Sequence, residues 1–131
     1  MNTILIKGEH IRKEVEATGV VTPGMQVSLV GAAGGGARKA FALENDLIGG
    51  GVDDDYAIGT VIQTGVMPPG AEVYALLGAS ENVAKGDPLQ GDGAGALVAL
   101  GTGDEPNTIA FAAEAVNNAT SGPIRIRVEV S

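Results

Sequence analysis

The residues best suited to chemistry are five carboxylates crowded into one short stretch, Glu44, Asp46, Asp53, Asp54 and Asp55. Carboxylate oxygens are the ligands that Ca²⁺ and Mg²⁺ take in proteins, so a metal site is the first hypothesis to test. A calcium loop of the EF-hand kind ends in a bidentate glutamate at a fixed spacing, and none can be placed here. The stretch therefore predicts a solvated acidic edge without a bound metal.

The same stretch continues as GGGVDDDYAIGTV, from Gly49 to Val61, which resembles the uridine-binding hairpin of trimeric dUTP pyrophosphatases. The resemblance implies that Asp53 orients the attacking water and that Tyr56 packs against the deoxyribose. The family's Pro-Arg-Ser-Gly phosphate loop and Gly-rich C-terminal lid are missing, and Ala57 stands where an arginine usually follows the tyrosine. Because the chain has only eight Lys and Arg, it would neutralise a triphosphate poorly. We predict no enzyme and no catalytic residues, with a dUTP pyrophosphatase-like enzyme as an alternative.

Two other segments contain parts of ligand-binding motifs. Residues 31–36, followed by Arg38 and Lys39, are glycine-rich but match neither phosphate-loop spacing, and predicted strands flank them where a helix is required. Residues 83–89 resemble a hairpin segment of biotinyl and lipoyl carrier domains, but the following turn has no lysine for attachment. His10 is the only histidine and there is no cysteine, so neither ligation nor catalysis is predicted there. The sequence predicts no cofactor.

The composition predicts one domain with a thin core. A chain of 131 residues fits a single domain, but two Phe, two Tyr and no Trp leave burial to smaller side chains. The 21 glycines add to the entropy lost on folding. Such a chain gains stability by pairing with copies of itself, so we expect self-association.

The charge excludes two classes of partner. The net charge is −8, whereas nucleic-acid binding depends on Lys and Arg that replace counterions, and an acidic surface also opposes anionic membranes. The N-terminal apolar run Ile4-Leu5-Ile6 is too short for a signal peptide, and no segment approaches the roughly 20 apolar residues of a membrane span. We expect neither nucleic acid nor a membrane as a partner.

Short strands separated by turns predict an all-β fold, a small barrel or sandwich with long Gly-rich loops. The clearest alternation of apolar and polar residues runs from Ile124 to Val130, and a second runs from Ile11 to Thr18. Turn residues delimit further strands, predicted over residues 26–30, 38–43, 57–64, 72–77 and 96–100. Residues 107–119 fit both helical and strand spacing, and we predict a strand because they make a hairpin with the last strand.

Taken whole, the chain resembles the small capsid-decoration (cement, or head-stabilising) proteins of tailed double-stranded DNA bacteriophages. The segments that carry the resemblance are residues 21–25, 41–46, 51–59, 83–89, 109–116 and 124–130. The resemblance implies a β-rich homotrimer on the outer capsid of the virion, made in the host cytoplasm. It would clamp neighbouring subunits of the major capsid protein and stabilise the head. A small-molecule-binding β-barrel is a further alternative, although few aromatics are present to line a pocket.

Residues 1–22 differ from the rest because they combine an apolar run with local positive charge. The residues predicted to contact the capsid are Ile4, Leu5, Ile6, Lys7, His10, Arg12 and Lys13. As an arm, this segment would add a strand to a neighbour's sheet edge, and its basic side chains would face acidic capsid groups. The alternative is that residues 3–7 form the first strand of the chain's own barrel.

Overall fold

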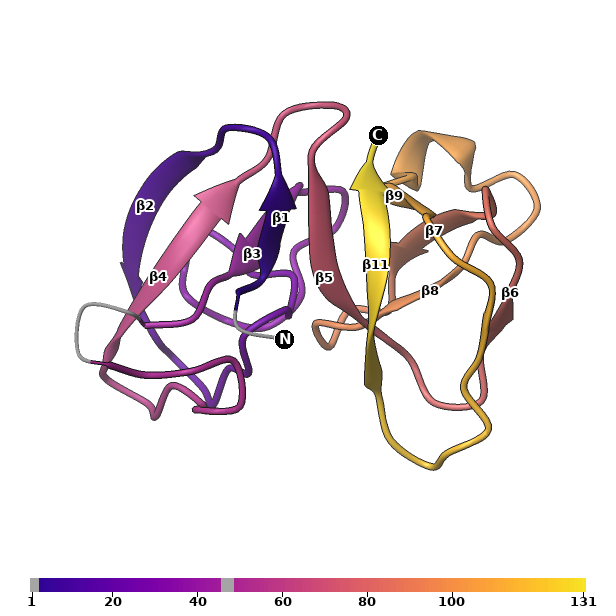
Figure 1. Ribbon diagram of the computed structural model, residues 1–131. Coiled ribbons are helices and arrows are strands. Elements are labelled where there is room, and N and C mark those ends of the chain that lie inside the picture. Colours follow the sequence, from indigo (N-terminus) through magenta and orange to yellow (C-terminus); the bar gives the residue numbers. More distant parts are fainter. Residues whose placement is uncertain (1–2, 46–48) are drawn as a thin grey trace.

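The computed structural model describes residues 3–45 and 49–131, and this part of the chain is all-β, as predicted. It contains no α-helix, and its described helical turn is the short 3₁₀ segment Glu105–Asn107. Two lobes stand side by side, with β1 and β5 between them (Figure 1).

The larger lobe is a small barrel. Its strands, in spatial order, are β5 (Glu72–Leu77), β11 (Ile124–Val130), β9 (Ala110–Ala112), β7 (Pro88–Gly91) and β8 (Leu97–Ala99). A parallel pairing between Leu77 and Leu97 joins β8 back to β5 and closes the ring. The predicted alternation of β11 is confirmed, because Ile126, Val128 and Val130 are buried while Glu129 is exposed.

The smaller lobe is built on a three-stranded antiparallel sheet. Its order is β2 (Ile11–Glu16), β4 (Val61–Val66) and β3 (Ala40–Ala42), so β4 lies in the middle. β2 forms one edge of this sheet, and most of its residues are exposed. A separate short pair, β6 (Asn82–Val83) and β10 (Val116–Asn117), lies beside the barrel.

Two hydrophobic cores correspond to the two lobes. The larger contains the inward side chains of the barrel, and the smaller contains Val21, Val27, Tyr56 and Ile62 with several alanines. β3 lies between them, because Phe41 packs into the larger core and Ala40 and Ala42 into the smaller. The burial of every residue of β3 holds the lobes together.

The first strand, β1 (Leu5–Lys7), pairs with the beginning of β5 on the edge opposite β11. Tyr74 donates its backbone N–H to the carbonyl of Ile4 at 2.8 Å, and Ile4 is 0% exposed. The segment from Ile4 to Lys7 is therefore built into the fold, with Leu5–Lys7 as a strand of the sheet.

Two predicted strands differ from those observed. Over residues 26–30 only Gln26 and Val27 form isolated bridges, because the chain then turns between Ser28 and Gly31. The strand predicted over residues 57–64 begins at Val61, because Thr60 donates its N–H to the carbonyl of Ala57 and closes a turn. Residues 107–119 contain β9 and β10, so the strand prediction holds for part of that range.

Candidate functional site

The predicted acidic edge consists of carboxylates that are tied to different parts of the fold. Glu44 accepts hydrogen bonds from the Thr3 hydroxyl at 2.8 Å and from the Ile4 N–H at 2.9 Å. Asp54 accepts from the Gly51 N–H at 2.7 Å, and Asp53 pairs with Arg125 at 2.8 Å. Asp46 lies outside the described residues. Among residues 3–45 and 49–131, no three acidic, His or Cys side chains are grouped as metal ligands would be.

Arg125 on β11 is the polar centre of this region, and the sequence analysis missed it. Its guanidinium donates to the carbonyl oxygen of Pro23 at 3.1 and 3.2 Å, to that of Val52, and to the Asp53 carboxylate. The side chain is only 15% exposed although it points away from the barrel interior. Alternation alone predicts a solvent-facing arginine here, since the loops that cover it come from distant parts of the chain.

Tyr56 has a structural position. Its side chain is 4% exposed in the smaller core, and its hydroxyl donates to the carbonyl oxygen of Leu43 at 2.6 Å. Tyr56 lines a surface hollow together with Asp54 and Asp55. Asp53, in contrast, has an 88% exposed side chain and lines another hollow, together with Thr22 and Met25. The two residues of the dUTP pyrophosphatase-like motif thus line different surface hollows, and with Tyr56 only 4% exposed, little of its ring can pack against a deoxyribose.

We expect no hydrolysis of dUTP above the rate in buffer with Mg²⁺ present, because Asp53 is engaged by Arg125 and Tyr56 is enclosed. The measurement is pyrophosphate release by the purified chain, with Asp53→Asn as the matched variant. Metal-dependent release that disappears in Asp53→Asn would contradict this prediction.

The glycine-rich residues 31–36 form a tight loop against a second loop of the barrel. Gly34 donates its N–H to the Gln26 carbonyl at 2.7 Å, and an added Cβ would lie 2.4 Å from the Gly93 carbonyl oxygen. Glycine is required here for the close approach of two backbones, with φ at +90°. This packing explains the glycines without a phosphate.

The predicted capsid-contact residues fall into two groups. The side chain of Ile4 is inside the core, while Leu5, Ile6 and His10 are half-buried. Lys7, Arg12 and Lys13 are exposed. A capsid contact at these exposed positions stays a prediction, whereas the Ile4 side chain is not available at the surface of the single chain.

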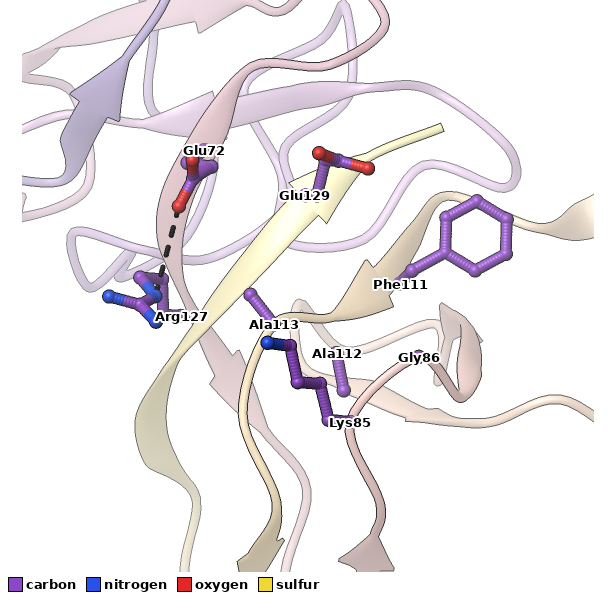
Figure 2. A pocket seen from close by; sticks show the side chains of 8 residues that line it. All are labelled: Glu72, Lys85, Gly86, Phe111, Ala112, Ala113, Arg127 and Glu129. Atoms are coloured by element: carbon purple, nitrogen blue, oxygen red, sulfur yellow. Dashed lines mark ion pairs between the residues drawn. The ribbon is translucent and has the colours of Figure 1, made fainter.

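The outer face of the barrel has a charged hollow of about 310 Å³ over β5, β9 and β11. Figure 2 shows Glu72, Arg127 and Glu129 standing on neighbouring strands, with Phe111 and Lys85 at the border. The Glu72 carboxylate forms two ion pairs: its Oε1 lies 3.7 Å from Arg127 Nε, and its Oε2 lies 3.7 Å from Lys7 Nζ. Because the Glu72 carboxylate has two basic groups nearby, the hollow is suited to contact with a polar surface, and its lining contains no Ser, Cys or His nucleophile.

Comparison with known proteins adds no identification. No protein-family model matches the chain, and no significant match to a curated protein was found. Within the described residues, no helix has the length and apolar character needed to cross a membrane.

Proposed function

We propose that this chain is a capsid-decoration protein that binds the outer surface of a tailed-phage head as a homotrimer and stabilises it. The observation that carries the proposal is the exposed edge strand β2. Within the described part of the chain it pairs only with β4, and it carries Arg12 and Lys13 in a chain of net charge −8. An edge strand of this kind is suited to extending a partner's sheet.

The exposed basic side chains would orient the chain on the major capsid protein. Lys7 on β1 and Arg12 and Lys13 on β2 are exposed and would face acidic capsid groups, contributing mainly to orientation and association rate. The backbone of β2 would contribute hydrogen bonds to an adjacent capsid strand.

The interior of the barrel supports a structural role over ligand binding. Leu77, Leu89, Leu97, Ile126 and Val128 are each no more than 1% exposed, so the chain's own side chains fill the space between the strands. A small-molecule carrier needs a cavity at this place.

We expect the purified chain to be a trimer at micromolar concentration and to bind heads of the phage that encodes it in stoichiometric amounts. Light scattering coupled to size-exclusion chromatography measures the first, and co-sedimentation with heads measures the second. The charge-reversal variant Arg12→Glu/Lys13→Glu should weaken head binding, light scattering shows whether that variant still assembles, and Lys85→Glu on the barrel serves as the control. Wild-type protein that does not sediment with heads would refute the proposal.

A further inference from the structure

The exposed large apolar side chains of the chain are gathered at one place. Of the seven found among the described residues, five lie where β2 ends and β4 begins. We call this set the turn-tip patch, and it consists of Val20, Leu29, Val30, Ile58 and Val61. Their exposed fractions run from 45% to 68%.

Backbone hydrogen bonds bring the three segments of the turn-tip patch together. Thr18 donates its N–H to Gly31 at 3.1 Å, which places the turn of Leu29 and Val30 beside the end of β2. Gly59 donates to Ala17 at 2.8 Å, and Ala17 donates to Thr60 at 2.7 Å. The turn that contains Ile58 is therefore fixed to the same strand end.

The side chains at these tips are unusual for turns, which favour Gly, Asn, Asp, Ser and Pro. Leu29 and Val30 stand between Ser28 and Gly31, whose N–H to carbonyl bond of 3.2 Å closes the turn. The backbone there is closely seated, since a Cβ on Gly31 would lie 1.9 Å from the Glu16 carbonyl oxygen. Aliphatic side chains on such a fixed surface indicate a preformed interaction site.

A hollow of complementary character lies at the opposite end of β2 and β4. It has a volume of about 370 Å³, and its apolar lining comes from Ile11, Val66, Met67 and Pro68. Ile11 pairs with Val66 at one end of the β2–β4 ladder, and Glu16 pairs with Val61 at the other. The chain therefore has an apolar protrusion at one end of this sheet and an apolar hollow at the other (lower left and upper end of β2 and β4 in Figure 1).

Charges beside the two surfaces are also complementary. Exposed Glu16 pairs with Val61 in the β2–β4 ladder. Asp54 and Asp55 line a hollow together with Ala57 and Thr60, the two ends of the turn that contains Ile58. Carboxylates therefore border the turn-tip patch. The lining of the apolar hollow also includes Glu9 and His10, and the exposed basic residues Arg12 and Lys13 follow Ile11 directly on β2. Acidic groups around the patch oppose an anionic lipid surface and favour a basic border on the partner.

We infer that the partner of the turn-tip patch is the hollow of a second copy of this chain. The contact is head-to-tail: Leu29, Val30 and Ile58 of one copy meet the Ile11–Val66 end of the next. Such a heterologous contact forms a closed ring when its rotation closes. The inference rests on the trimer of the proposed function, for which it supplies the interface, whereas binding to heads is measured separately.

The test uses two variants, each defective in one half of the contact. Leu29→Ser/Val30→Ser/Ile58→Ser removes the protrusion, and Ile11→Asp introduces a charge into the hollow. We expect each alone to raise the concentration for half-dissociation of the trimer by at least about tenfold. An equimolar mixture should form dimers, since one intact protrusion then meets one intact hollow. Phe111→Ser, an exposed apolar residue outside both surfaces, should leave the trimer unchanged.

Light scattering over a concentration series reads the assembly, and thermal unfolding shows whether each variant folds. If the triple variant does not fold, Glu16→Lys tests the same contact through its charged border, with weaker assembly expected. Variants that stay trimeric overturn the inference, and if they also lose head binding the patch contacts the capsid instead. Wild-type chain that stays monomeric at every concentration overturns it too, while head binding alone decides the decoration role.

Discussion

Ile4→Ala is expected to lower the free energy of unfolding by about 2–5 kcal/mol, the usual cost of emptying a fully buried isoleucine site. Ile4 is 0% exposed in the larger core, and its carbonyl accepts the Tyr74 N–H that joins the first strand to β5. The substitution leaves a cavity in the larger core. Urea denaturation followed by circular dichroism at fixed protein concentration measures the loss, since association also contributes to apparent stability.

Ile6→Ala provides the matched control, because Ile6 lies two residues after Ile4, is half-buried in β1 and is not part of the larger core. Its expected loss is clearly smaller than that of Ile4→Ala. If Ile4→Ala lowered the free energy of unfolding no more than Ile6→Ala does, the N-terminal segment would behave as a detachable arm. Full stability together with lost head binding in Ile4→Ala would favour the arm even more strongly.

The strands that could be predicted are those in which alternation and burial agree. β11 and β5 were predicted with their observed bounds, because their inward residues are apolar and turn residues flank them. β7 was not predicted, since Pro88 and Gly91 at its ends are typical of turns. Pro88 is tolerated there because it is the first residue of its strand.

Apolar residues alone misled the prediction where exposed side chains belong to turns. Leu29 and Val30 extend the apolar run from Val27, so the pattern favours a strand, but both side chains are 67% exposed in a turn. Ile58 likewise makes the predicted strand begin too early, because it is an exposed apolar residue in the turn before β4. The pattern records apolarity, and it cannot distinguish residues that face the chain's own core from residues that face solvent or a partner.

The candidate site shows a similar division. The basic character of residues 7–13 is visible in the sequence, and Lys7 on β1 and Arg12 and Lys13 on β2 are exposed in the structure. The burial of Tyr56 cannot be predicted from the sequence, because it depends on contacts with distant parts of the chain. These are the hydrogen bond to the Leu43 carbonyl and the bridge to Val21. Long-range contacts thus determined which residues of the DDDY motif remain at the surface.

Arg125→Ala is expected to cost about 2–3 kcal/mol, because it leaves buried carbonyl oxygens without donors. Arg125 connects β11 to two loops of the other lobe through the carbonyls of Pro23 and Val52, and both residues are buried. Its ion pair with Asp53 contributes less, since that carboxylate is 88% exposed to solvent and salt. The loss should therefore come from the uncoupling of the two lobes rather than from the lost charge pair.

The comparison with Asp53→Asn separates these two contributions. Asp53→Asn keeps the arginine and its carbonyl contacts, so we expect a loss of no more than about 1 kcal/mol, typical of an exposed pair. Urea denaturation measures both variants, and hydrogen exchange should show faster exchange in Arg125→Ala at the Tyr56 amide, which bonds to Val21 at 2.8 Å. Equal losses in the two variants would show that the ion pair dominates. No change in either would show that the loops are held by their own packing, because the smaller core already encloses Val21 and Tyr56.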